Sequence, residues 1–381
     1  MVTPRLKSIN CLADGKTLLL SRDPRSRVEL DDPDGQTRAL LVLLADGSRT
    51  PSELQTALAE RWPGIALGEI HDALDVLDGL GWLEDAAASP HLTAHQRRRH
   101  FSNLAFFDAF TTLDRSREEI QRELLDARVV VLGAGGLGSS VIQNLAGLGV
   151  SRLTILDFDT VELQNFARQF VYTEEQLGQP KAEQVAAWLQ RFDPGIDVQA
   201  VNARVTGPDD VRMLLPGADL VISAIDDPDE VDLWVNEACV GAGIPFIRGG
   251  LSYTQGLYWS VDPGRSACRR CLEAYRASFI EDIDIPLLTW ERVMQTERVN
   301  RGIGPVAQLL GAVVAMEALR YLTRIAPPVA AGAYQLIDFA GSCATTVDPW
   351  PQDPNCDVCA TAPRVRCAPA PRSAQTSPAR A

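Results

Sequence analysis

Positive charge is scarce in this chain of 381 residues. It carries 36 Lys and Arg against 50 Asp and Glu, which gives a formal net charge of -14. Proteins that bind nucleic acid need an excess of Lys and Arg against the phosphates, so this balance argues against a nucleic-acid partner. With 46% hydrophobic and 23% charged residues, the composition is typical of a soluble globular protein of two or three domains.

Long hydrophobic runs are also missing. The longest apolar stretch, residues 306–316, is interrupted by Gln308 and closely followed by Glu317 and Arg320. It predicts a buried helix, too short to span a bilayer. No apolar run follows a basic start, so we expect no signal peptide, no membrane partner and a cytoplasmic protein.

A glycine-rich turn between a strand and a helix organises the sequence. Residues 129–132 are apolar and β-branched, and apolar residues recur with helical spacing from Val141 to Val150. Glycines let the backbone approach a phosphate and expose N–H groups at a helix N-terminus, where the dipole favours negative charge. The predicted nucleotide-binding glycines are Gly133, Gly135, Gly136 and Gly138.

A second predicted strand, residues 152–156, ends in Asp157, where a carboxylate can reach a ribose hydroxyl. Up to this point a nicotinamide or flavin oxidoreductase remains open. Such an enzyme needs an apolar cleft for its ring, but the residues that follow are polar. They favour a polyphosphate site and lie within one short segment: Asp157, Asp159, Asn165, Arg168, Gln169 and Lys181.

These residues resemble those of the ubiquitin-activating-type adenylyltransferases, the family of ThiF, MoeB and the microcin C maturation enzyme. The pattern D-x-D-x-V-x-x-x-N-x-x-R-Q, then G-Q-P-K, is complete between Asp157 and Lys181, and Asp226 ends a further apolar strand. The resemblance covers residues 97–360. It implies an α/β fold with a Rossmann-like, doubly wound sheet, and an enzyme that joins a carboxylate to the α-phosphorus of ATP.

The resemblance also implies a role for each polar residue. The catalytic residues would be Asn165, Arg168, Lys181 and Asp226, the last holding Mg²⁺, which prefers oxygen ligands. Asp157 would bind the ribose, with Asp159 and Gln169 at the same nucleotide site. Cations and donors suffice for this chemistry, because negative charge builds on the phosphoryl oxygens and no protein nucleophile is needed.

Each of these residues also has a structural alternative. Arg168 and Asp159 could form an ion pair, Lys181 could lie on a surface helix, and Asp226 could cap the helix that follows it. The family order and spacing favour the functional interpretation. Asp227 stands where relatives usually carry asparagine, so the sequence assigns it no role.

Residues 95–110 resemble the family's opening motif, usually R-Y-x-R, in which an arginine reaches the nucleotide site of the partner subunit of a homodimer. The alignment places Arg99 at the first arginine and Ser102 where the second belongs. This departs from the family motif, and Arg97 or Arg98 could compensate for the missing arginine. A solvated basic helix face is the alternative.

Two CxxC pairs predict a structural zinc site. Four thiolates are the ligand set of a closed tetrahedral site, and the metal would connect segments separated by 84 residues. A redox pair explains them less well, because four ligands leave no open position. The predicted ligands are Cys268, Cys271, Cys356 and Cys359.

Among the other cysteines, Cys239 has helical spacing with apolar neighbours and is predicted to lie in the core. Cys343 and Cys367 could form a thioester or persulfide, although nothing indicates a lowered thiol pKa. Residues 279–300 are charged and irregular. Arg292, Arg298 and Arg301 could hold a peptide carboxylate or lie on an ordinary surface helix.

Residues 1–90 form a separate domain in this interpretation. Strands are expected at 11–20, 27–30 and 81–84, with helices at 38–44, from the Thr50–Glu53 capping box to about 62, and at 66–80. This winged-helix-like α+β module has no basic recognition face. It resembles the peptide-clamp domain of ribosomal peptide maturation enzymes, in which a leader peptide adds a strand to a sheet edge, although a structural or dimerising module remains open.

The sequence thus predicts a clamp domain (1–90), an adenylation domain with zinc (91–360) and a disordered tail (361–381). The favoured function is ATP-dependent adenylation of the C-terminal carboxylate of a ribosomally made precursor peptide. A ubiquitin-like sulfur carrier is the alternative substrate. A non-catalytic leader-peptide binder and a dinucleotide oxidoreductase are the other classes.

Overall fold

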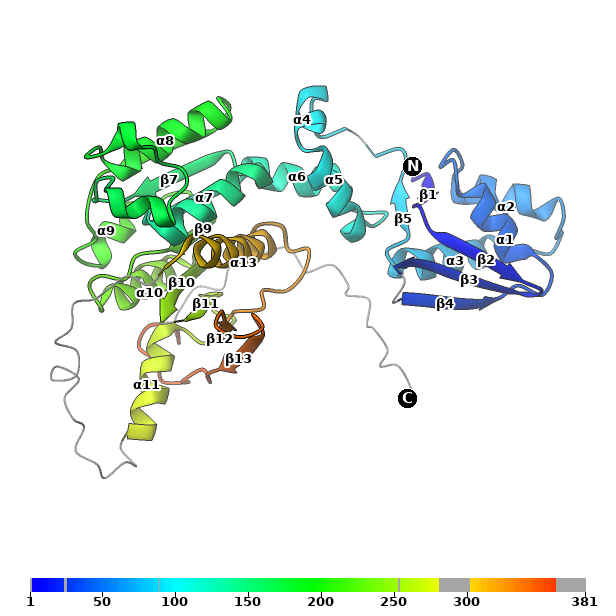
Figure 1. The fold of residues 1–381 in the computed structure, drawn as a ribbon. Coiled ribbons are helices and arrows are strands. Elements are labelled where there is room, and N and C mark those ends of the chain that lie inside the picture. The colour runs from blue at the N-terminus through cyan, green and yellow to red at the C-terminus, as the bar shows by residue number, and fades with distance from the viewer. Residues whose placement is uncertain (1, 24–25, 89, 253, 281–301, 361–381) are drawn as a thin grey trace. The chain divides into compact units, whose positions relative to one another are not determined.

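The computed structural model describes residues 2–23, 26–88, 90–252, 254–280 and 302–360. The chain divides into two compact units between Arg122 and Glu123 (Figure 1). The boundary predicted at residue 90 falls inside the first unit, because the backbone N–H groups of His91 and Leu92 donate to Glu118 Oε2 at 2.9 and 3.0 Å. Residues 91 and 92, which follow the predicted boundary, are therefore attached to the first unit.

The first unit contains two small antiparallel sheets. Strands β2 (Asn10–Asp14), β3 (Thr17–Asp23) and β4 (Ser26–Asp31) form one, and β1 (Pro4–Leu6) pairs with β5 (Leu83–Asp85) in the other. The single strand expected over 11–20 was wrong: Asp14 pairs with Thr17 across a two-residue turn, and Gly15 there has φ 60°. A glycine in the left-handed region is what such hairpin turns require.

Helices α1 (Gln36–Leu43), α2 (Pro51–Ala59) and α3 (Leu67–Gly79) complete the small domain. The predicted capping box is present, since Thr50 N donates to Glu53 Oε2 at 2.8 Å and Glu53 N to Thr50 Oγ1 at 3.4 Å. The predicted small α+β domain is confirmed. Its core consists mainly of leucine and isoleucine side chains together with Trp82, and it includes Leu18, Leu20, Leu44, Leu54, Leu58, Ile70 and Leu74.

Four shorter elements follow along the chain. They are α4 (Ala94–Arg99), α5 (Phe101–Phe107), the 3-10 turn η1 (Asp108–Phe110) and α6 (Arg117–Asp126).

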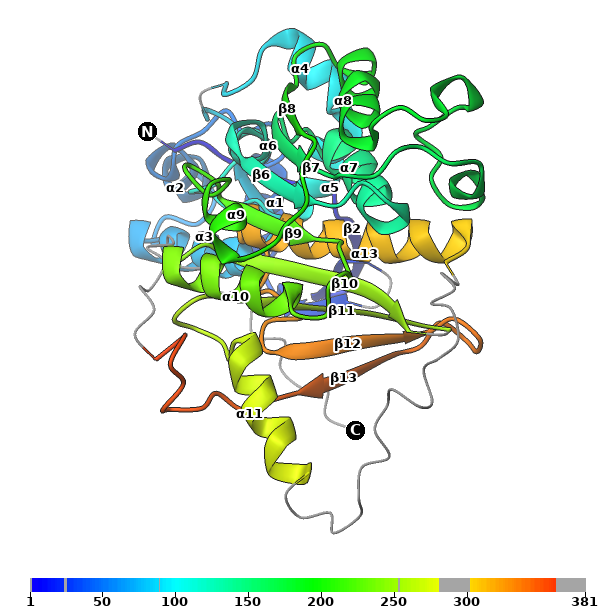
Figure 2. The ribbon, with the colours of Figure 1, turned by 90° about the vertical axis from the view of Figure 1, so that its left-hand side faces the viewer.

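The second unit is built on an eight-stranded sheet in the order β13-β12-β11-β10-β9-β6-β7-β8 (Figure 2). Its parallel strands are β6 (Arg128–Leu132), β7 (Arg152–Leu156), β8 (Asp197–Val201), β9 (Leu220–Ser223) and β10 (Phe246–Ser252). An antiparallel extension adds β11 (Gln255–Val261), β12 (Ala333–Asp338) and β13 (Thr345–Pro349). This confirms the predicted Rossmann-like sheet.

Helices cover both faces of this sheet, as Figure 2 shows. One face carries α7 (Gly136–Leu148), α8 (Lys181–Phe192) and α13 (Gly304–Thr323), and the other carries α9 (Pro208–Arg212) and α10 (Val231–Ala242). Helix α11 (Arg269–Ile280) and the 3-10 turns η2 (Leu163–Ala167) and η3 (Glu174–Gln176) complete the described elements of this unit. Helices α7 and α13 pack closely, since a Cβ at Gly311 would lie 2.2 Å from Ser140 Oγ.

Helix α13 is, within the described part of the chain, the single helix long and apolar enough to cross a membrane by length and composition. The expectation that this segment is too short to span a bilayer was wrong, because the helix has 20 residues. Its burial explains its composition: Leu310, Val314 and Leu319 are at most 2% exposed. The prediction of a core helix is confirmed.

Parallel strands end at one edge of a sheet, so the loops after β6, β7, β8 and β9 gather there. Most of the predicted nucleotide-site residues belong to these loops. Several other predictions lie outside the described residues: the carboxylate-binding arginines Arg292, Arg298 and Arg301, the tail 361–381, and Cys367.

Candidate functional site: a nucleotide site at the sheet edge

The glycine turn is closed by backbone contacts on both sides. Gly133 has φ 95°, and a Cβ there would lie 2.8 Å from the carbonyl oxygen of Ala224, at the end of β9. At Gly138, a Cβ would lie 1.9 Å from the carbonyl oxygen of Gly133. Gly135 is the N-cap of α7 and Gly136 is its first residue. The turn therefore requires glycine and places the N-terminus of a helix at the sheet edge.

The side chains of Arg168 and Gln169 lie against this turn. A Cβ at Gly136 would be 3.1 Å from Arg168 Cδ, and one at Gly135 would be 3.9 Å from Gln169 Nε2. Gln169 is 1% exposed, and its Oε1 has no hydrogen-bond partner among the described residues. Because a buried polar atom without a partner is costly, Gln169 has hydrogen-bonding capacity to offer a polar ligand at the turn.

Asp157 is connected directly to the turn. Its Oδ2 accepts from Ala134 N at 2.6 Å, and its Oδ1 accepts from Asp159 N at 2.8 Å. Burial raises the pKa of Asp157, while these two N–H groups and the charge of Lys181 oppose that rise. Tyr172 also holds the turn, since its hydroxyl donates to the carbonyl oxygen of Ala134 at 2.8 Å. No local sequence pattern marks this tyrosine as part of the site.

Lys181 is the first residue of α8 and is 5% exposed. Its Nζ lies 2.8 Å from Asp159 Oδ2. The structural alternatives for Lys181 and for Arg168 are therefore wrong. Lys181 is buried instead of lying on the surface, and Asp159 pairs with Lys181 and not with Arg168. The structure places a buried ammonium group and a carboxylate next to Asp157.

Asn165 is also buried, at 3% exposure, and its Oδ1 accepts from the backbone N–H of Glu162 at 3.0 Å. This bond fixes the short turn η2, from which Arg168 and Gln169 follow. Asn165 thus has a structural role in placing those two residues, and its contact with a phosphate remains a prediction.

Asp226 is exposed and lies three residues beyond β9. It is not a helix cap, because the N-cap of α10 is Glu230, so that alternative is wrong. Ala224 and Ile225, immediately before it, contact the position where Gly133 would carry a Cβ, at 2.8 and 2.9 Å. The chain therefore leaves β9 at the glycine turn and continues to an exposed carboxylate, which suits Mg²⁺ and a phosphate.

Arg99 ends α4 in the first unit and is exposed. Its proposed reach into a partner's site remains a prediction. Arg97, a possible substitute, donates to the carbonyl oxygen of Leu92 at 2.8 Å and lies 3.4 Å from Glu118 Oε1. Because Arg97 is used within its own unit, Arg98 is the better candidate for a substitute.

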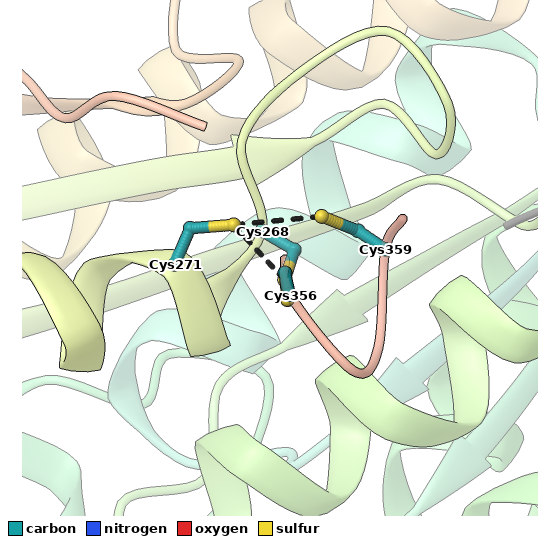
Figure 3. A group of neighbouring side chains, drawn as sticks. All are labelled: Cys268, Cys271, Cys356 and Cys359. Atoms are coloured by element: carbon teal, nitrogen blue, oxygen red, sulfur yellow. Dashed lines mark hydrogen bonds between the residues drawn. The ribbon is translucent and has the colours of Figure 1, made fainter. Parts of the chain in front are cut away.

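The four predicted zinc ligands converge in one buried cluster (Figure 3). Their sulfur atoms all lie within 4.8 Å of one another, with separations of 3.4 Å for Cys271–Cys359, 3.7 Å for Cys268–Cys356 and 3.8 Å for Cys268–Cys271. A tetrahedral site with Zn–S bonds of about 2.3 Å has S–S edges of about 3.8 Å, so the cluster fits a zinc ion. The ligand atoms would be the sulfurs of Cys268, Cys271, Cys356 and Cys359.

Two side-chain amides lie near these sulfurs. Asn236 Nδ2 lies 3.7 Å from the sulfur of Cys268, and Gln352 Nε2 lies 3.7 Å from that of Cys359. Burial raises the pKa of Cys359 to about 11 and raises that of Cys268 as well. Such thiols ionise readily only beside a cation, and N–H donors of this kind support thiolate ligands. Cys239, in contrast, is fully buried in the core, as predicted.

Comparison with known proteins identifies the family. The sequence model of the ThiF family matches residues 108–358, more than half of the chain. The chain belongs to the ThiF family. A molybdopterin-synthase adenylyltransferase of Salmonella typhimurium is 34% identical over 63% of this chain and 90% of its own length. The sulfur carrier protein ThiS adenylyltransferase of Escherichia coli is 31% identical over 57% of this chain and 80% of its own length.

Members of the ThiF family are ATP-dependent adenylyltransferases, and this ThiF-family chain is an enzyme of that class. Solved structures extend the likeness of fold. Escherichia coli MccB superimposes with a TM-score of 0.74 at 19% identity, over 94% of this chain and 99% of that one. The structure of PaaA superimposes with a TM-score of 0.65 at 15% identity, over 90% of this chain and 98% of that one. The fold shared with MccB therefore extends beyond the segment that the family model matches.

Proposed function

We propose that this enzyme adenylates the C-terminal carboxylate of a ribosomally synthesised precursor peptide, and that its first unit binds that peptide. One observation supports this most. The family match begins at residue 108, yet the fold shared with MccB covers 94% of the chain, so the additional N-terminal domain is part of the likeness. MccB is described as a microcin C7 biosynthetic enzyme and has been solved with N-formylated MccA.

The first unit has sheet edges that fit a peptide. Within the described residues, β2 and β4 each pair with β3 alone, so both outer edges of this sheet are open. All five residues of β2 are exposed, and Leu12 is 67% exposed. An extended peptide could add a strand there through main-chain hydrogen bonds.

The second unit supplies the chemistry. In the proposed reaction a carboxylate oxygen of the peptide attacks the α-phosphorus of ATP, the bond to the bridging oxygen breaks, and pyrophosphate leaves. Arg168 and Lys181 would neutralise the phosphates and the helix at Gly136 would donate to them, while Asp226 would hold Mg²⁺. Lys181 would exchange its contact with Asp159 for a contact with a phosphate.

We also infer that the four cysteines hold one structural zinc ion, which takes no part in the reaction. A homodimer is the assembly that a trans arginine at position 99 requires. The zinc inference rests on the geometry of the cysteine cluster and on the resemblance to the family. The homodimer inference rests on that resemblance.

A ubiquitin-like sulfur carrier is the second candidate substrate. It is favoured by the 34% and 31% identities to adenylyltransferases named for molybdopterin synthase and ThiS. The N-terminal domain favours the peptide, because it precedes the segment that the family model matches.

ATP–pyrophosphate exchange separates these candidates. With a short peptide encoded beside the gene, we expect exchange that Asp226→Ala lowers by at least about 100-fold, since an electrostatic group of the transition state is removed. Asp209→Ala is the matched control, because Asp209 is an exposed acid on α9 that pairs with Arg212. Exchange with a sulfur carrier alone would favour the second substrate, and exchange with neither would contradict both.

A further inference from the structure

A groove of about 460 Å³ lies between helices α1 and α2 of the first unit. Its lining is largely apolar and includes Leu43 and Ala57, and Val42 beside them is 69% exposed. Two arginines also line it, Arg38 on α1 and Arg61 just after α2. Neither the proposed nucleotide chemistry nor strand addition at a sheet edge uses this groove.

Both arginines are held in place and still reach solvent. The Nε of Arg38 lies 3.8 Å from Asp32 Oδ2, and 49% of the Arg38 side chain is exposed while that of Asp32 is fully buried. Asp32 is itself fixed, since its Oδ1 accepts from Thr37 N at 2.9 Å. The Cζ of Arg61 lies 4.8 Å from the centroid of the Trp62 ring. Side chains that are already ordered lose less conformational entropy on binding, so these guanidinium groups are prepared to receive an acid.

The groove favours a helix as its occupant. Its lining residues belong to α1, to α2 and to positions next to these helices. Because helical backbone groups bond within their own helix, the groove offers side chains and few main-chain partners. An extended peptide needs such partners, whereas a helix satisfies its own backbone. An amphipathic helix that lays an apolar stripe into a groove is a common mode of recognition.

Helix α3 of the same chain has an exposed face of matching chemistry. Glu69, Asp72, Val76 and Gly79 recur at intervals of three and four residues, so they form one stripe along the helix, and Asp75 flanks it. These residues are exposed, Val76 to 58%. A Cβ at Gly79 would meet nothing within 4 Å, so the stripe is open to close approach. It combines an apolar centre with acids on both sides.

This face cannot enter the groove of its own domain. The opposite side of α3, with Ile70 and Leu74, is buried in the same core as Leu54 and Leu58 of α2. Turning the exposed stripe toward α2 would remove those side chains from the core. The groove of another copy has no such restriction. In a chain with a net charge of -14, a groove with two arginines is locally opposite in sign and attracts an acidic surface.

We propose that α3 of one chain docks into the α1–α2 groove of a second copy of this chain. Val76 packs against Val42, and Asp72 and Asp75 pair with the two arginines of the groove. This contact is additional to the homodimer inferred from a trans arginine, because it uses α1, α2 and α3 and involves no nucleotide site. One helix in one groove buries less area than a typical stable interface, so the contact forms at micromolar concentrations.

The test is sedimentation velocity of the full-length protein over the micromolar range. We expect the association state of the wild type to rise with concentration. Arg38→Glu with Arg61→Glu, or Asp72→Lys with Asp75→Lys, should raise the concentration needed for half-association at least about tenfold, since like charges then face each other. An equimolar mixture of the two double variants should associate again, because acids and bases have exchanged sides in every pairing between them.

Two further variants separate this effect from a loss of folding or a change of net charge. Val42→Glu places an acid in the groove at an exposed position, leaves the buried carboxylate of Asp32 with its arginine, and should weaken association to the same degree. Lys16→Glu with Arg49→Glu is the matched control, because it changes the net charge as much as the arginine pair does at positions that do not line the groove. It should associate like the wild type.

Three results would overturn the proposal. A wild-type association state that does not change with concentration would show that no second copy occupies the groove. A mixture of the two double variants that stays as dissociated as each alone would show that the acids of α3 do not meet these arginines. If Arg38→Glu with Arg61→Glu weakened binding of the precursor peptide and left self-association unchanged, the groove would bind that peptide instead.

Discussion

At the scale of single residues, the glycine turn allows the sharpest prediction. A Cβ at Gly138 would lie 1.9 Å from the carbonyl oxygen of Gly133, a backbone atom that cannot move aside without opening the turn. We expect Gly138→Ala to weaken ATP binding by at least about tenfold, because the N–H groups at the start of α7 would be displaced. Isothermal titration with Mg·ATP measures this loss.

The same helix provides the control. Gly147 lies in the last turn of α7, and a Cβ there would meet nothing within 4 Å. Gly147→Ala should leave ATP binding unchanged and stabilise the protein by up to about 1 kcal/mol, since alanine is the better helix former. Equal binding by Gly138→Ala and the wild type would show that the turn does not contact the nucleotide.

Residue identities at this site were largely predictable, whereas their contacts were not. The glycines, Asp157 and Asp226 follow strands recognisable from local apolar runs, so the sequence predicted their place at one sheet edge. The burial of Lys181 and its pairing with Asp159 depend on α8 packing against the sheet, which a local pattern does not report. The contact of Arg204 with Phe158 joins two loops that are far apart in the chain, and nothing in the sequence marks it.

At the scale of elements, the four-cysteine cluster connects the start of α11 to the segment after β13. Its four sulfurs fit a tetrahedral ion, and Trp350 Nε1 donates to the carbonyl oxygen of Cys268 at 3.1 Å beside it. We expect one zinc per chain by elemental analysis. Cys359→Ser should abolish it and lower Tm by at least about 5 °C, since structural zinc contributes directly to folding stability.

Cys343→Ser is the control for this prediction, because Cys343 is exposed and lies outside the cluster. It should keep both the zinc and the Tm of the wild type. If the wild-type protein purified without chelators contained no zinc, or if Cys359→Ser retained it, the four thiols would not form a metal site.

The open edges of the three-stranded sheet can be tested separately. In antiparallel pairs, hydrogen-bonded and non-hydrogen-bonded residues alternate. Since Asp14 and Thr17 close a two-residue turn, the N–H of Ala13 is directed to the free edge of β2. Between β3 and β4, the hydrogen bond from Asp32 N to Lys16 O shows which residues are hydrogen-bonded pairs. Glu29 belongs to a non-hydrogen-bonded pair with Leu19, so its N–H is directed to the free edge of β4.

Proline tests these edges because it removes one N–H donor and is tolerated on edge strands. We expect one of Ala13→Pro and Glu29→Pro to raise the Kd of the precursor peptide about tenfold, the effect of one lost main-chain hydrogen bond, and the other to serve as its matched control. Fluorescence anisotropy of a labelled peptide measures this. Unchanged affinity in both variants would exclude strand addition.

The sequence predicted most helices of the first unit but not its strand pairing. The capping box at Thr50 and the apolar spacing of α3 are local signals, and both helices are present. Strand β1 has three residues, and only its contact with β5 defines it. The Asp14–Gly15 pair, in contrast, was a readable turn signal, so the hairpin between β2 and β3 could have been predicted.

At the scale of the whole molecule, the proposed homodimer predicts complementation between two inactive proteins. If Arg99 acts in the partner's nucleotide site, Arg99→Ala and Asp226→Ala each abolish pyrophosphate exchange. In a mixed dimer, the site with an intact Asp226 receives the intact Arg99 of the other subunit, while the second site carries both defects. Half of the dimers in an equimolar mixture are mixed, so about a quarter of wild-type exchange should return.

This complementation depends on symmetry and therefore distinguishes a trans arginine from one that acts within its own chain. An arginine acting in its own chain would leave both sites of every mixed dimer defective, and the mixture would stay inactive. Arg97→Ala is the matched control, because Arg97 is engaged by Glu118 within the first unit and should retain exchange without mixing. Full exchange by Arg99→Ala alone would show that position 99 has no part in the reaction, and the search for a trans arginine would move to Arg98.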